Sequence, residues 1–96
     1  MYYYINMYKV KIKNKVLKNV KKMPSARQDD FFDLIEDLQA TGPIQKGWKN
    51  FSPLNDKKTE FHCHLDYRWV ACWRVLSDSQ LELEVYYAGS REKAPY

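Results

Sequence analysis

Two histidines and an arginine lie close together in one short stretch of this sequence, Glu60 to Trp73 (EFHCHLDYRWVACW). An imidazole takes or gives a proton near neutral pH, because its reference pKa is about 6.5. A guanidinium stays charged and binds phosphate oxygens through two N–H groups at once. His62, His64 and Arg68 therefore have the residue types for proton transfer beside a bound phosphate.

The same stretch predicts two strands that fold back on each other near Asp66-Tyr67, because apolar and polar residues alternate with the period of a half-buried strand. A two-residue turn pairs Leu65 with Arg68 and puts the histidines on the face of the tryptophans. A three-residue turn pairs His64 with Arg68 and puts all three polar side chains on one face, and a slightly longer turn of the same parity keeps the histidines there. We expect the three-residue turn or the slightly longer one, because both turn only apolar side chains of the hairpin toward the helices. These side chains are Phe61, Cys63, Leu65, Trp69, Ala71 and Trp73.

Each polar residue of the hairpin also has an ordinary structural interpretation. Histidines of a half-buried strand often bond a neighbouring carbonyl group, and Arg68 could form a salt bridge with Asp66 inside the turn. The pattern His62-Cys63-His64 resembles a set of zinc ligands, but Cys63 is expected on the opposite face and no third ligand on the same face is evident. We therefore expect no metal and no cofactor.

Length and composition favour one small globular domain, residues 1–96. Apolar residues make up 45% of the chain and charged residues 29%, a balance that argues against general disorder. No apolar run approaches the roughly 20 residues of a membrane span, and the first residues lack a signal-peptide pattern. Cys63 and Cys72 have no CxxC spacing. We therefore interpret the protein as cytoplasmic and the two cysteines as reduced core thiols, rather than as a disulfide.

Charge is segregated along the chain although the net charge is only +4. Residues 9–22 contain lysines and no acid, whereas residues 29–37 contain aspartates and glutamate and no base. A basic surface suits a polyanion such as nucleic acid, or an acidic protein partner. The alternative is a lysine face that is simply solvated. The lysines are at positions 9, 11, 13, 15, 18, 21 and 22.

The remaining elements give the order β-α-α-β-β-β. Alternation predicts a strand near residues 3–12, two apolar stripes predict helices over about residues 14–23 and 25–41, and residues 80–87 alternate as a further strand. Residues 43–59 show no clear period and predict a connecting loop. The fold class is α+β, with a helical hairpin packed on one face of a small, mainly antiparallel sheet.

This order, the lysine-rich first helix ending at Met23-Pro24, and the string HCHLDYRWVACW…EVYYAGSREKAPY resemble the RelE/ParE toxin superfamily over nearly the whole chain. The resemblance implies a toxin of a type II toxin–antitoxin system. RelE-like members cleave mRNA on the ribosome, whereas ParE-like members share the fold, inhibit DNA gyrase and have no RNA-cleaving residues.

Carried over from the family, Arg68 matches the strand arginine, Arg91 the tail arginine and Tyr96 the terminal tyrosine, while His62 and His64 stand where RelE has two lysines. Metal-free RNA cleavage needs a base for the 2′-OH, cations for the phosphorane and an acid for the leaving oxygen. These five residues can meet the three needs, although the alternative for Arg91 and Tyr96 is a frayed chain end.

The resemblance thus implies a ribosome-dependent endoribonuclease, with the ribosome and mRNA, a cognate antitoxin, and operator DNA through the antitoxin as partners. We predict that ribosomal RNA phosphates contact four lysines of the basic segment: Lys11, Lys13, Lys18 and Lys22. Two alternatives remain, a ParE-like gyrase inhibitor and a non-catalytic member that binds only an antitoxin or operator DNA.

Overall fold

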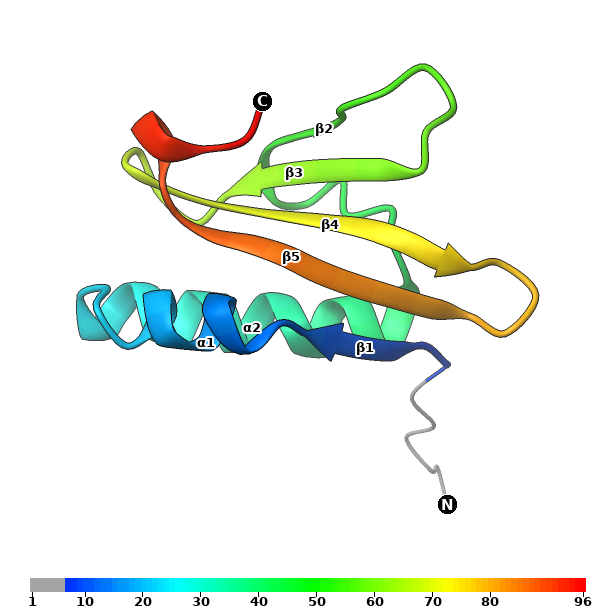
Figure 1. The fold of residues 1–96 in the computed structure, drawn as a ribbon, viewed down its shortest axis with the longest axis horizontal. Helices are drawn as coiled ribbons and strands as arrows, with labels where there is room; N and C mark the ends of the chain where they lie inside the picture. The colour runs from blue at the N-terminus through cyan, green and yellow to red at the C-terminus, as the bar shows by residue number, and fades with distance from the viewer. Residues whose placement is uncertain (1–6) are drawn as a thin grey trace.

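A computed structural model describes residues 7–96 as two helices on one face of a five-stranded sheet (Figure 1). The strands run in the order β1-β5-β4-β3-β2, with β1 parallel to β5 and every other neighbour antiparallel. The elements are β1 (Lys9–Ile12), α1 (Asn14–Val20), α2 (Ser25–Thr41), β2 (Lys49–Pro53), β3 (Glu60–His64), β4 (Trp69–Ser77), β5 (Glu82–Ser90) and the 3₁₀ turn η1 (Arg91–Lys93). The predicted α+β class and the helical hairpin on one face are confirmed.

The first strand, β1, pairs in parallel with the last strand, β5, and its side chains alternate between the core and solvent. Val10 and Ile12 pack against the core, while Lys9 and Lys11 are exposed. Residues 3–6 of the predicted strand lie outside the described residues. The α1–α2 hairpin then connects β1 back across the sheet, and α2 ends at Gly42, whose φ of 88° is a conformation that favours glycine.

The core lies between the helices and the sheet. Its largest fully buried side chains include Phe31 and Leu34 of α2, Phe61 of β3 and Trp73 of β4. The indole N–H of Trp73 donates a hydrogen bond to the carbonyl oxygen of Pro43 at 3.1 Å, so its polar atom is satisfied despite burial. Neither helix of the described residues is long and apolar enough to cross a membrane.

Two sequence predictions need correction. The predicted loop 43–59 contains β2, which pairs with β3 through Ser52 opposite His62 and is interrupted by a bulge between Lys49 and Ser52. Asn50 within that bulge has a φ of 54°, so the strand does not alternate and its pattern is hidden. Helix α1 is also shorter than predicted, because it ends at Val20 and a turn leads into Pro24.

A second bulge puts two tyrosines on the face of the sheet away from the helices. Cys72 pairs with Tyr87 and Trp73 pairs with Val85, so Tyr86 is an extra residue in β5. Leu83, Val85 and Ala88 consequently face the core. We call the opposite face, which carries His62, His64, Cys72, Arg74, Glu84, Tyr86 and Tyr87, the open face of the sheet.

We predict that Phe31→Ala lowers the free energy of unfolding by about 3–5 kcal/mol, because it removes a ring that is 0% exposed. Phe32→Ala, the matched control on the same helix, removes a ring that is 48% exposed and is expected to cost far less. Chemical denaturation of both variants measures the difference. Equal losses would contradict the assignment of the buried helix face.

Candidate functional site

The register of the β3–β4 hairpin decides which face carries the histidines. His62 pairs with Cys72 and His64 with Val70, and Leu65 to Trp69 form a loop between the paired residues. The loop is therefore longer than the three-residue turn, but it keeps the histidines on the predicted face. His64 does not pair with Arg68. Both imidazoles lie on the open face, while Phe61, Cys63, Leu65, Ala71 and Trp73 face the core as predicted.

The two imidazoles and the last residue of the chain form an aromatic cluster. The ring centroids of His62 and Tyr96 are 4.5 Å apart, and those of His62 and His64 are 5.7 Å apart. Figure 1 shows η1 and the C-terminal residues on the face of the sheet opposite the helices. The terminal tyrosine is thus packed against the first histidine rather than frayed, although its side chain remains half exposed.

Both histidines are expected to be neutral at pH 7. Burial lowers the pKa of His62, the hydrogen-bonding contact with Ser52 partly offsets this, and the charge of His64 lowers it further. Burial also lowers the pKa of His64, and the positive charge of Arg91 adds to that effect, against a raising contribution from Asp66. Ser52 Oγ lies 3.2 Å from His62 Nδ1 and orients that ring. Neutral imidazoles can accept protons.

The tyrosine hydroxyl keeps its proton in the same surroundings. Burial raises the pKa of Tyr96 above 10.0, and the nearby Cys72 adds to this, while the positive charge of Arg91 acts in the opposite direction. Burial likewise raises the pKa of the Cys72 thiol to about 12. The cluster therefore combines neutral bases with a protonated hydroxyl group.

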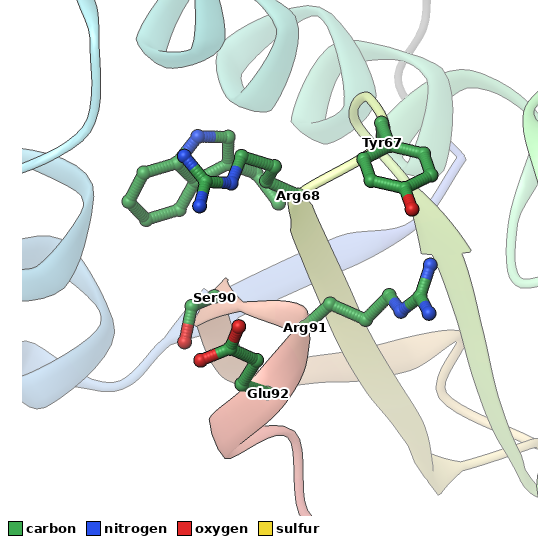
Figure 2. Close-up of a pocket in the computed structure, with 6 residues that line it drawn as sticks. Tyr67, Arg68, Ser90, Arg91 and Glu92 are labelled. Atoms are coloured by element: carbon green, nitrogen blue, oxygen red, sulfur yellow. The ribbon is translucent and has the colours of Figure 1, made fainter.

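Arg91 and Arg68 are joined through the backbone but extend to different sides. The backbone N–H of Arg91 donates to the carbonyl oxygen of Arg68 at 2.7 Å. The guanidinium of Arg91 lies over the ring of Tyr67, 5.3 Å from its centroid, whereas Figure 2 shows the Arg68 side chain extending away from both. Arg91 approaches His64 from the tail as predicted, while Arg68 lies in the loop just before β4 rather than within a strand.

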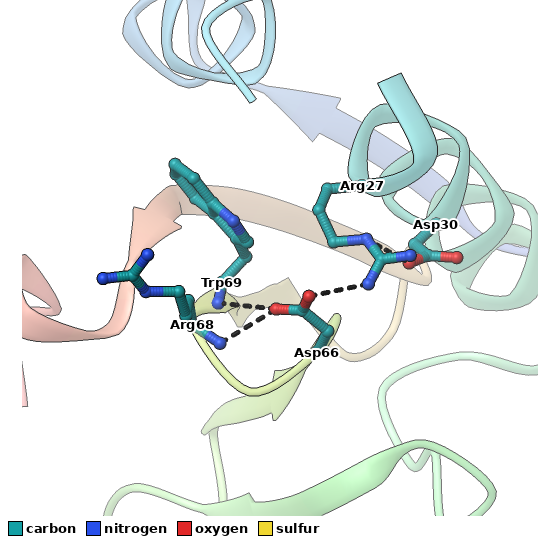
Figure 3. Close-up of polar contacts among 5 residues, drawn as sticks. All are labelled: Arg27, Asp30, Asp66, Arg68 and Trp69. Carbon is teal, nitrogen blue, oxygen red and sulfur yellow. Dashed lines mark hydrogen bonds and ion pairs between the residues drawn. The ribbon is translucent and has the colours of Figure 1, made fainter. Parts of the chain in front are cut away.

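The loop that carries Arg68 is held by the carboxylate of Asp66 (Figure 3). Asp66 Oδ1 accepts hydrogen bonds from the backbone N–H groups of Arg68 at 2.8 Å and Trp69 at 3.2 Å. Asp66 Oδ2 accepts one from Nη1 of Arg27 in α2 at 2.7 Å, and the Nε of Arg27 lies 3.0 Å from Asp30. The alternative of an Arg68–Asp66 salt bridge is wrong, because Asp66 pairs with Arg27 instead.

The four lysines predicted to contact RNA are exposed: Lys11 lies on β1, Lys13 just before α1, Lys18 on α1 and Lys22 in the turn after it. Lys11 Nζ lies 3.5 Å from Glu82 Oε2, so part of its charge is neutralised. Within residues 7–96, the ammonium groups of Lys13, Lys18 and Lys22 have no acidic partner. These three are the better candidates for phosphate contacts.

Sequence reasoning missed three contributors to the site. Ser52 was placed in a loop, because β2 has no recognisable alternation. Arg27 contacts a loop 39 residues further along the chain, which no local pattern reveals. Tyr67 lies in the predicted turn, and only the structure shows that its ring is 77% exposed and available as a contact surface.

No metal centre is found among residues 7–96, where no group of three or more His, Cys, Asp or Glu side chains is placed to hold an ion. Cys63 and Cys72 are both free and buried. They lie in the adjacent strands β3 and β4 but on opposite faces, with Cys63 in the core. This fits their interpretation as reduced thiols.

Two helices pack on one face of a small sheet, and the other face carries His62, His64 and Tyr96 with the charge of Arg91 nearby. No family model and no curated protein matches the sequence. Solved structures match over nearly the whole chain. The RelE protein of the archaeal RelE–RelB complex from Pyrococcus horikoshii OT3 superposes with a TM-score of 0.76 at 17% identity, covering 92% of this chain and 99% of that one.

Two further solved structures agree. The YoeB/ParE toxin from Agrobacterium tumefaciens has a TM-score of 0.67 at 16% identity, covering 86% of this chain and 98% of that one. A chain of the E. coli DinJ–YafQ toxin–antitoxin complex has a TM-score of 0.65 at 14% identity, covering 94% of this chain and 99% of that one. The chain therefore has the fold of the RelE/ParE toxin superfamily, as the sequence resemblance implied.

We predict that the Asp66 carboxylate makes folding stability sensitive to acid. Burial raises the pKa of Asp66, but hydrogen bonds from the Arg68 N–H, the Arg27 side chain and the Trp69 N–H outweigh it and hold the pKa below 3.8. A lowered folded-state pKa stabilises the protein above the unfolded value, and that contribution is lost as the pH falls through the folded value.

Asp66→Asn is therefore expected to lower stability at pH 7 and to flatten the loss of stability between pH 5 and pH 2, measured by denaturation at each pH. Asp33→Asn, an exposed acid on α2, serves as the matched control. An unchanged acid profile in Asp66→Asn would show that the Arg27–Asp66 contact does not form in solution.

Proposed function

We propose that this protein is the toxin of a toxin–antitoxin pair and cleaves mRNA on the ribosome without a metal. One observation carries the proposal: His62 and His64 of β3 gather on the open face of the sheet with Arg91 and Tyr96 of the C-terminal residues. A protein that acts only by binding has no need for neutral bases and a protonated hydroxyl beside a guanidinium.

The proposed reaction is attack of a ribose 2′-oxygen on the adjacent phosphorus. A neutral imidazole takes the 2′-OH proton, the new P–O2′ bond forms, and the P–O5′ bond breaks to leave a 2′,3′-cyclic phosphate. The leaving 5′-oxygen receives a proton. The half-buried His64, beside Arg91, is the base in this proposal.

The other members of the site stabilise charge and supply the second proton. Arg91, whose guanidinium influences both His64 and Tyr96, binds the phosphate oxygens on which negative charge accumulates. Tyr96 gives its proton to the leaving oxygen, because its raised pKa keeps the hydroxyl protonated. The buried His62 packs against Tyr96 and holds its ring in place. Arg68 contacts the RNA strand further along from the cleaved phosphate.

A cognate antitoxin is the proposed protein partner, and operator DNA would be reached through it. Two of the solved structures with this fold are complexes of toxin and antitoxin, RelE–RelB and DinJ–YafQ. Exposed lysines of β1 and α1 offer a basic surface to an acidic antitoxin segment as well as to RNA. Co-expression with the neighbouring small open reading frame is expected to restore growth.

The direct test is induction in a bacterial host, followed by mapping of mRNA 5′ ends and analysis of plasmid supercoiling. New 5′ ends within translated codons and unchanged supercoiling are expected. Altered supercoiling with intact mRNA would instead indicate the gyrase-inhibiting alternative.

We predict that His64→Ala lowers the rate of mRNA cleavage on purified ribosomes by about 100-fold or more, the typical contribution of a general base. Thr59→Ala, exposed just before β3, is the matched control and is expected to be active. Since the pKa of His64 is lowered from 6.5, the wild-type rate should be constant near pH 7 and fall only at pH values below 6.5. A rate that rises in acid would exclude an imidazole base.

We also predict that Lys13→Gln, Lys18→Gln and Lys22→Gln together weaken ribosome binding and reduce the slope of its salt dependence by about 2–3, because each lost phosphate contact releases one fewer counterion. Lys46→Gln, Lys57→Gln and Lys58→Gln remove the same charge from exposed loops and serve as the control. Lys11→Gln alone should have a small effect, since Lys11 pairs with Glu82. Equal behaviour of the two triple variants would refute the assignment.

A further inference from the structure

A pocket of about 400 Å³ opens between the β3–β4 loop and the start of η1 (Figure 2). This volume lies within the range of small-molecule sites. The pocket is lined by Tyr67, Arg68, Trp69, Ser90, Arg91 and Glu92. We propose that it binds one nucleotide of the RNA strand next to the cleaved phosphodiester and prefers guanine. This inference rests on the proposed function, because the pocket and the imidazole cluster share Arg91.

The walls of the pocket are fixed before any ligand binds. The backbone hydrogen bond from Arg91 to Arg68 ties the two walls together at 2.7 Å, and the Tyr87 hydroxyl donates to the carbonyl oxygen of Ser90 at 2.7 Å. The Asp66 carboxylate holds the backbone of Arg68 and Trp69 from the other side. A site held in this way loses little conformational entropy on binding.

The guanidinium groups give the pocket its affinity for the phosphates. Asp66 is engaged by Arg27, which leaves the exposed Arg68 side chain available for a ligand. Arg91 extends on the other side, over the ring of Tyr67. An RNA strand that passes from Arg68 to Arg91 would place one phosphate on the first guanidinium and the next phosphate on the second.

The aromatic side chains provide surfaces for the base. Single-stranded RNA is recognised by stacking of unpaired bases on aromatic rings and by hydrogen bonds to their Watson–Crick edges. Trp69 is half-buried at the wall, and Tyr67 is 77% exposed on the loop. Stacking alone does not distinguish strongly between bases, since every base has a π face.

Glu92 supplies the selectivity in this proposal. Figure 2 shows its carboxylate beside Ser90, across the pocket from Arg68. A carboxylate accepts hydrogen bonds only, and guanine presents two adjacent N–H donors, at N1 and N2, that match its two oxygens. Uracil presents one N–H between two carbonyl oxygens, which the carboxylate repels. Adenine and cytosine each offer a single amino group.

The test uses the purified full-length chain labelled with ¹⁵N, titrated with guanosine 3′-monophosphate and with uridine 3′-monophosphate. We expect shifts of the Trp69 indole and the 90–92 amide signals, and a dissociation constant at least about fivefold lower for the guanine nucleotide, the lower end for a bidentate contact. Glu92→Gln should remove this preference and keep uridine binding. Lys93→Gln, an exposed neighbour in the same turn, should leave the preference unchanged.

Absence of shifts at the pocket, or an equal preference in Glu92→Gln and wild type, would overturn the proposal. This readout needs neither ribosomes nor cleavage, so its outcome is independent of the proposed reaction. Nucleotide binding without mRNA cleavage would support the proposed nucleotide site and contradict the proposed endoribonuclease activity. Cleavage of mRNA without nucleotide binding at the pocket would support the endoribonuclease activity and contradict the nucleotide site.

Discussion

The carboxylate of Asp66 closes the loop between β3 and β4, and the rest of the site depends on that closure. Its two oxygens accept hydrogen bonds from the Arg68 and Trp69 backbone and from Arg27 of α2, so the loop is held to the helical layer. The loop length sets the pairing of His64 with Val70, and a one-residue slip would send every side chain of β3 to the opposite face. The observed pairing keeps both histidines out of the core, and the Asp66 contacts hold the loop at the end of the hairpin.

The same parity links stability to chemistry. It fills the core with Phe61, Cys63 and Trp73, and it leaves His62 and His64 on the open face where the C-terminal residues reach them. Burial lowers the pKa of both imidazoles, and the positive charge of Arg91 lowers that of His64 further. The terminal tyrosine packs against His62 and is also the proposed acid.

The sequence was sufficient to predict what alternation and burial decide locally. The hairpin parity, the inward side chains of β1 and the helical hairpin all follow from patterns that a half-buried element must show. The sequence did not reveal β2, because a bulge at Asn50 breaks its alternation, and it did not reveal the Arg27–Asp66 contact, which joins distant segments. Alternation predicts the parity of the hairpin but not the length of its loop, so Arg68 lies in the loop and not in a strand. The catalytic roles of the five predicted residues stay predictions.

The central claim is that both imidazoles lie on the open face, packed with Tyr96, and are neutral at pH 7. An NMR titration of the chain's two histidines measures this directly, because His62 and His64 are its only imidazoles. We expect pKa values below 6.5 for both, contacts between the His62 and Tyr96 ring protons, and a rise in the pKa of His62 in Tyr96→Ala as solvent reaches the ring. Values above 6.5, or rings that make no contact, would contradict it.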